Sequence, residues 1–119
     1  MHDERLTRLT RLVRVREQRT RARERDRSER RRSRVSAEEA LARQEATLRA
    51  AQTDLDRSVS QVYKQAAGSA LTGDEMVSFF AHLATKRTVI ATERSAVAAA
   101  ETVCNVLRAE EDKARAALR

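Results

Sequence analysis

Apolar residues recur every seven positions in two separate parts of the chain. A repeat of this length is typical of coiled-coil helices, in which one apolar stripe faces a neighbouring helix. The pattern therefore predicts two long helices, and we call their apolar stripes the seam. The first series is Leu41, Leu48, Leu55 and Val62, and the second is Met76, Leu83, Ile90, Val97 and Cys104.

The segment from Gly68 to Gly73 separates the two series. It contains both glycines of a chain that has no proline. Gly68 can adopt the left-handed backbone conformation that ends many helices. Thr72 and Glu75 match a capping box, in which a threonine hydroxyl accepts a hydrogen bond from the backbone N–H three residues later. These signals predict that one helix ends and another begins within this segment.

A turn this short forces the two helices to lie antiparallel. The two series then pair in a single register, in which the numbers of facing residues always add up to 145. The same register places Arg34 opposite Glu111. The seam pairs are Leu41 with Cys104, Leu48 with Val97, Leu55 with Ile90, Val62 with Leu83, and Ala66 with Phe79.

The predicted fold is all-α: one long two-helix antiparallel coiled-coil hairpin over residues 1–119. Helix one is expected over about 3–67, the turn over 68–73 and helix two over about 74–118. A composition with only 3% aromatic residues and a mean hydropathy of −0.69 agrees with a narrow seam rather than a globular core.

The excess positive charge lies in the N-terminal part of the chain. Residues 1–34 contain 14 arginines and 6 acidic residues, a net charge of +8, whereas residues 35–119 contain 11 basic and 12 acidic residues, a net charge of −1. In the predicted register, helix two ends opposite position 26, so residues 1–25 have no facing helix. A basic segment of this kind indicates an acidic partner such as a protein surface, a nucleic acid or an anionic membrane face.

The sequence offers no pattern of catalytic or metal-binding residues. His82 lies one position off the seam, Cys104 lies in the seam, and no histidine or cysteine cluster has metal-ligand spacing. We therefore expect a protein that is not an enzyme and has no cofactor. A single cysteine favours the reducing cytoplasm, and no apolar run is long enough for membrane insertion.

All three aromatic residues lie near the turn, at Tyr63, Phe79 and Phe80. Phe79 and Phe80 are adjacent and point about 100° apart on a helix, so one seam cannot bury both of them. Either these rings pack at the tip of the hairpin or they form an exposed anchor for a partner protein.

The layout resembles the YscO/FliJ family, the stalk proteins of type III secretion and flagellar export. The resemblance rests on the N-terminal RLTRLTRLVRVREQRTRARE, on a long polar helix followed by a short turn, and on the aromatic MVSFFAHL at the start of the second helix. It covers nearly the whole chain. It implies a cytoplasmic coiled coil at the secretion apparatus that binds the hexameric export ATPase, the membrane-embedded export gate and secretion chaperones.

The resemblance also implies two binding regions. The tip would contact the gate or chaperones through Val59, Tyr63, Phe79 and Leu83, to which the adjacent Phe80 is added as an aromatic candidate. The basic end would contact the ATPase through Arg5, Arg8, Arg11, Arg14, Arg16, Arg19, Arg23, Arg27 and Arg31.

Two other interpretations stay open at this point. A basic segment followed by heptads is also the layout of some DNA-binding coiled coils, although the turn interrupts the heptads and residues 16–34 contain no asparagine to read bases. A structural or chaperone-like coiled coil, either monomeric or homodimeric, is the other interpretation, whereas the stalk hypothesis predicts a monomer.

Overall fold

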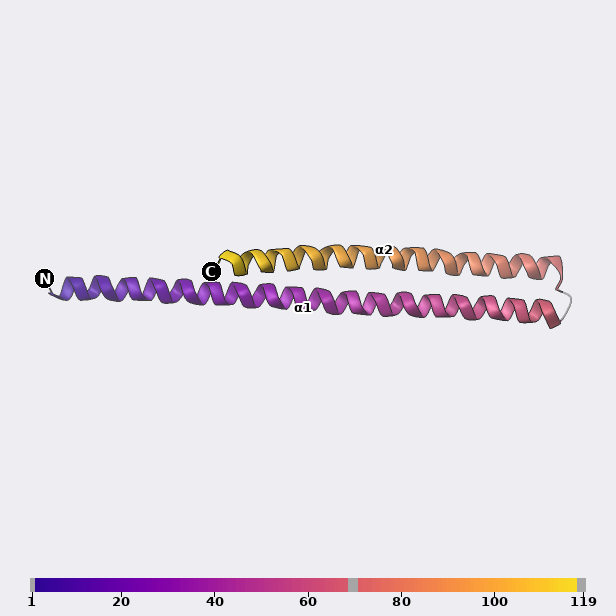
Figure 1. Cartoon of the computed structure of the whole chain (residues 1–119), viewed down its shortest axis with the longest axis horizontal. Helices are drawn as coiled ribbons and strands as arrows, with labels where there is room; N and C mark the ends of the chain where they lie inside the picture. Colours follow the sequence, from indigo (N-terminus) through magenta and orange to yellow (C-terminus); the bar gives the residue numbers. More distant parts are fainter. Residues whose placement is uncertain (1, 69–70, 118–119) are drawn as a thin grey trace. The chain divides into compact units, whose positions relative to one another are not determined.

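The computed structural model describes residues 2–68 and 71–117, and all of these except Leu71 and Thr72 lie in two α-helices. Helix α1 spans His2–Gly68 and helix α2 spans Gly73–Ala117 (Figure 1). No strand occurs in these two ranges. The predicted all-α two-helix hairpin is therefore confirmed.

Both helices begin with acidic residues, and α2 also ends with a basic one. Asp3 and Glu4 lie in the first turn of α1, and Asp74 and Glu75 lie in the first turn of α2. Arg115 lies in the last turn of α2. Acidic groups at a helix N-terminus and basic groups at a C-terminus each stabilise the helix by roughly 0.3–1 kcal/mol through the helix dipole.

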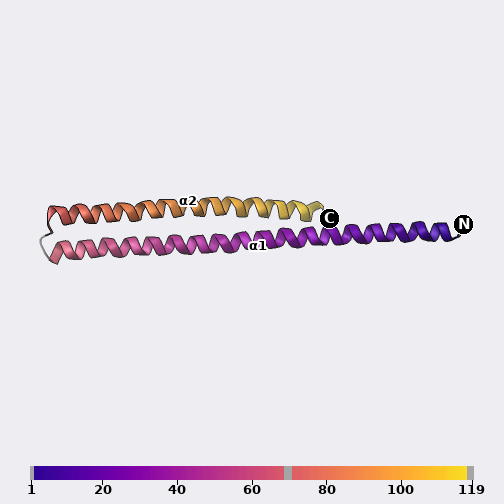
Figure 2. The same cartoon turned by 180° about the vertical axis from the view of Figure 1, so that it is seen from behind.

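The chain divides into two compact units, and each unit contains a stretch of both helices. Unit 1 consists of Met1–Ser36 and Val106–Arg119, and unit 2 consists of Ala37–Asn105. Within unit 2 the two helical stretches lie side by side, both in the view of Figure 1 and in the view from behind (Figure 2).

The core of unit 2 is formed by the seam of α2. Leu83 and Ile90 are each 5% exposed and Cys104 is 1% exposed. The facing seam residues of α1 are half-buried, because two helices alone cannot enclose both of their stripes. This half-buried set comprises Leu41, Leu48, Leu55 and Val62, together with Val97 of α2. Ala66, predicted to face Phe79, stays exposed.

The turn in unit 2 differs from the prediction at its glycines. Gly68 is the last residue of α1 and Gly73 is the first residue of α2, and neither has a positive φ. The predicted left-handed conformation at Gly68 is therefore wrong. The helical conformation persists through this residue, so the connection spans residues 69–72, of which 69 and 70 lie outside the described part of the chain.

The start of α2 follows the predicted capping box. The backbone N–H of Glu75 donates to the hydroxyl of Thr72 at 3.2 Å, and the N–H of Met76 donates to the Thr72 carbonyl at 3.0 Å. The hydroxyl thus satisfies one of the N–H groups that lack an intrahelical partner at a helix N-terminus. This bond fixes where the second helix begins.

In unit 1 the end of α2 packs against α1 around one acidic residue. Glu111 is 7% exposed and accepts a hydrogen bond from the Nε of Arg34. This is the Arg34–Glu111 pair that the register predicts. Toward its N-terminus, α1 extends beyond the end of α2 (Figure 1), and every side chain from residue 3 to residue 29 is exposed.

Candidate functional site

The basic end of α1 is an exposed helical surface that carries both charge and apolar side chains. All nine arginines predicted to contact a partner, from Arg5 to Arg31, are exposed. Five apolar residues share this surface, with exposures between 42% at Val15 and 62% at Leu12; the others are Leu6, Leu9 and Val13. A helix in water gains nothing from exposing large apolar groups, so this combination is typical of a binding surface.

Arg25 and Arg30 of this basic end form hydrogen bonds within α1. Arg30 donates from Nε to the carboxylate of Asp26 at 3.0 Å, one helical turn away. Arg25 donates from Nε to the carbonyl of Arg21 at 3.5 Å, which is a long and weak bond. An exposed pair at this spacing contributes only about 0.3–0.5 kcal/mol. These local bonds therefore cost little to break when an acidic group approaches.

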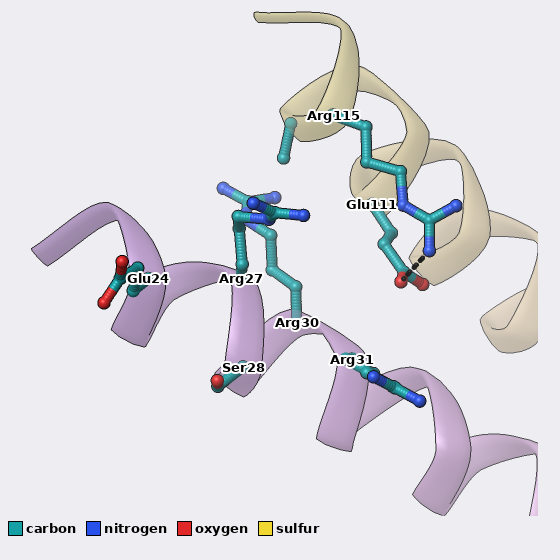
Figure 3. A pocket seen from close by; sticks show the side chains of 8 residues that line it. Glu24, Arg27, Ser28, Arg30, Arg31, Glu111 and Arg115 are labelled. Atoms are coloured by element: carbon teal, nitrogen blue, oxygen red, sulfur yellow. Dashed lines mark hydrogen bonds and ion pairs between the residues drawn. The ribbon is translucent and has the colours of Figure 1, made fainter. Parts of the chain in front are cut away.

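Where α2 ends, the two helices of unit 1 form a shallow hollow of about 270 Å³. Figure 3 shows the guanidinium groups of Arg27 and Arg30 extending from α1 toward the end of α2 that carries Arg115. Glu111 lies at the same place and accepts a hydrogen bond from Arg115 Nη2 at 3.2 Å (Figure 3). Several guanidinium groups thus gather around one buried carboxylate, an arrangement that attracts further carboxylates.

The tip of unit 2 exposes some of its predicted contact residues and buries others. Tyr63 is 71% exposed and Phe80 is 58% exposed, whereas Phe79 and Val59 are half-buried. Leu83, which the sequence assigned both to the seam and to the tip, is 5% exposed, and its side chain therefore belongs to the seam.

Sequence reasoning missed one exposed apolar residue near the tip. Val77 is 69% exposed and lies three residues before Phe80 on α2, so the two side chains share one face of the helix. The signal was available, because Val77 directly follows the seam residue Met76 and must point about 100° away from it.

Lys86, which interrupts the seam of α2, forms a polar contact between the helices of unit 2. Its Nζ donates to the carboxylate of Asp54 and to the hydroxyl of Ser58, both at 2.7 Å. The hydrogen bond from Lys86 lowers the pKa of Asp54, and the charges of Lys86, His82 and Arg57 lower it further. The long aliphatic part of the lysine side chain lets its charged amino group reach polar partners at the edge of the seam.

The remaining candidate reactive groups occupy the places that the sequence predicts. Cys104 is a free thiol in the core of unit 2, and His82 is exposed on α2. Across residues 2–68 and 71–117, histidine, cysteine and acidic side chains form no cluster of three that could hold a metal ion.

Neither helix, over its described residues, combines the length and apolar character needed to cross a membrane.

Comparison with known proteins assigns the chain to no family. It matches no protein-family model, no curated protein and no solved structure.

Proposed function

We propose that this protein is a non-enzymatic stalk of a type III secretion export apparatus. Its basic end would bind the hexameric export ATPase, and its tip would bind the export gate or secretion chaperones. The protein would act at the cytoplasmic face of the membrane-bound apparatus, as a monomeric hairpin. It would work through contacts between proteins, without a cofactor.

The observation that carries the proposal is the exposed arginine-rich stretch of α1, residues 3–29. The stretch is continuous with the helix of the hairpin, which suits a shaft that reaches into a ring. Its net positive charge would attract the acidic surface of a partner and speed their association. The sequence resemblance to the YscO/FliJ family supplies the identity of that partner.

The tip supports the second contact of the proposal. Tyr63 and Phe80 are both more than half exposed, and aromatic side chains dominate the binding energy of many protein interfaces. They lie in unit 2, whereas the basic stretch lies in unit 1. Separate surfaces would let one chain bind the ATPase and the gate without competition between the two.

A binding experiment with the export ATPase of the same genome tests the proposal. We expect the purified chain to retain the ATPase hexamer and to raise its hydrolysis rate. Replacing Arg5, Arg8 and Arg11 by glutamine should weaken retention about fivefold, since three exposed charges at a few tenths of a kcal/mol each sum to about 1 kcal/mol. Unchanged retention by this triple variant, or no binding by the unmodified chain, would contradict the ATPase contact.

Nucleic-acid binding is a second candidate, favoured by the arginines on every face of residues 3–29. Polyanion binding by such a segment depends steeply on salt, because each phosphate contact releases counterions. Retention of duplex DNA at physiological salt with a steep slope against salt concentration would favour this function. Loss of DNA binding at that salt, with ATPase binding kept, would favour the stalk.

A further inference from the structure

Three of the five exposed apolar residues of the basic end, Leu6, Leu9 and Val13, fall in the heptad phase of the interhelical contact in unit 1. Arg34 occupies a contact position, because it donates to the buried Glu111 of α2. Counting back along α1 in steps of seven from Arg34 reaches Arg27, Thr20, Val13 and Leu6. The face of α1 that contacts α2 therefore continues beyond the contact, with apolar residues at its far end.

A second row of this face runs parallel to the first. Arg30 is half-buried beside the end of α2, and steps of seven back from it reach Arg23, Arg16 and Leu9. Rows at this spacing form the two edges of a coiled-coil contact. We call the resulting surface the extended seam face; it consists of Leu6, Leu9, Val13, Arg16, Thr20, Arg23 and Arg27.

The extended seam face has the composition of one half of a coiled coil. Leu6, Leu9 and Val13 are 61%, 58% and 52% exposed, and together they make an apolar group on one face. From Leu6 to Arg27 the helix extends about 32 Å at 1.5 Å per residue. A facing helix of about three heptads would cover this length and bury the apolar group.

The charge of this surface selects the kind of helix that can cover it. Arg16, Arg23 and Arg27 are all exposed and lie on the face itself. A second copy of the chain is disfavoured, because it would bring together two segments with net charges of +8. Within unit 1, Arg34 shows the alternative: an arginine in this phase is satisfied by a glutamate from the facing helix.

A nucleic acid explains the surface less well than a helix does. Phosphate contacts would leave Leu6 and Leu9, which are 61% and 58% exposed, without a partner for their apolar surface.

We propose that the extended seam face binds an acidic amphipathic helix of a partner protein. The helix would lie antiparallel to α1, as the last turns of α2 do in unit 1. It would place apolar residues against Leu6, Leu9 and Val13 and glutamates against Arg16, Arg23 and Arg27, repeating the pairing of Arg34 with Glu111. This inference does not depend on the proposed function, since any protein could supply such a helix.

A synthetic peptide tests the proposal without knowledge of the partner. The probe is a fluorescent peptide of about 21 residues, helical by composition, with three glutamates in its first half and three leucines in its second half at the spacings that match the face. A matched peptide has glutamine at the three glutamate positions. We expect the full chain to bind the acidic peptide, measured by anisotropy, at least about tenfold more tightly than the glutamine peptide.

Matched arginine variants separate a specific face from general charge attraction. Arg16→Gln, Arg23→Gln and Arg27→Gln together remove three charges from the extended seam face. Arg8→Gln, Arg11→Gln and Arg25→Gln together remove three charges from the opposite side of the same exposed helix. We expect the first triple to weaken peptide binding at least about tenfold and the second triple less than about threefold.

Matched apolar variants test the apolar part of the extended seam face. Leu6→Gln with Leu9→Gln should weaken peptide binding at least about tenfold, whereas Val15→Gln, on the opposite side, should leave it within about twofold. All of these residues are exposed, so circular dichroism should show unchanged helix content in every variant.

Three results would overturn the proposal. Equal losses from the two arginine triples would show general charge attraction. No binding of the acidic peptide at millimolar concentration in low salt would show that the face takes no such helix. The third result is that a 20-base-pair DNA duplex binds more tightly than the peptide and that both arginine triples weaken DNA binding equally. It would assign the surface to nucleic acid instead.

Discussion

Arg34 of α1 and Glu111 of α2 lie 77 positions apart in the sequence and form an ion pair in unit 1. Glu111 is 7% exposed and also accepts a hydrogen bond from Arg115 at 3.2 Å. Arg34 is itself partly buried, with 24% of its side chain exposed, whereas the Arg115 side chain is 57% exposed. The pair therefore differs from ordinary surface ion pairs, because water screens it only in part.

Replacing Glu111 by glutamine should destabilise unit 1 by about 1–2 kcal/mol. The amide still accepts a hydrogen bond, but it removes the negative charge that two arginines share. Urea unfolding followed at 222 nm, with amide hydrogen exchange at residues 106–117, measures the loss. Glu110→Gln is the matched control, since Glu110 is exposed, and should change stability by less than about 0.5 kcal/mol. Equal effects of the two variants would contradict the assigned role of Glu111.

Cys104, the most deeply buried described side chain, should react with thiol reagents only when the helices of unit 2 separate. It is 1% exposed. We expect labelling by a disulfide reagent to be at least about a hundredfold slower in buffer than in denaturant, because the opening of a packed core costs several kcal/mol. Labelling of the folded chain at the denatured rate would show that the thiol is accessible.

The heptad pattern predicted buried side chains of the seam, because a coiled coil relates sequence spacing directly to geometry. Leu83, Ile90 and Cys104, three of the predicted seam residues, are the buried apolar side chains of the described structure. The contact between Arg34 and Glu111 followed from the same register. Long-range contacts of this kind are predictable only where both partners belong to regular, straight elements.

Local chemistry at the turn and at the seam edge was less predictable. Gly68 stays helical, because a glycine permits the left-handed conformation without requiring it. The bonds from Lys86 to Asp54 and Ser58 depend on side-chain reach rather than on heptad spacing. The heptad phase of residues 6–27 indicates a facing helix, but no spacing in the chain names the protein that supplies it.

Thr72→Ala should destabilise unit 2 by about 1 kcal/mol, since it removes the hydroxyl that caps α2. Thr72→Ser is the matched variant and should retain most of the stability, because serine supplies the same oxygen atom. Thermal unfolding followed by circular dichroism measures both. A loss of equal size in the two variants would mean that the threonine methyl group, rather than the cap, is responsible.

The bond between Asp54 and Lys86 should contribute to stability only above the acidic range. The pKa of Asp54 in the folded chain lies below its ordinary value of 3.8, because Lys86 stabilises the charged form. A depressed pKa adds stability that is present above pH 4 and is lost as the pH falls through the folded-state pKa. Asp54→Asn should therefore lower the thermal midpoint more at pH 7 than at pH 2.

The nearby Asp56 provides the control for that measurement. It is exposed on the same helix, and Asp56→Asn removes the same charge without touching Lys86. We expect its thermal midpoint to follow that of the unmodified chain from pH 7 to pH 2. An Asp54→Asn effect that is as large at pH 2 as at pH 7 would show that shape, and not the charge of Asp54, is responsible.

Leu83→Ala and Phe80→Ala should separate stability from binding at the tip, although the two residues lie only three positions apart. Leu83 is 5% exposed, so its truncation should cost about 2–4 kcal/mol in urea unfolding, whereas Phe80 is 58% exposed and its truncation should cost less than about 1 kcal/mol. If the tip binds the export gate or a chaperone, Phe80→Ala should weaken that binding at least about tenfold while the fold persists. If the affinity of the partner falls only with Leu83→Ala, binding depends on the integrity of the seam. That result would rule out an aromatic anchor at Phe80.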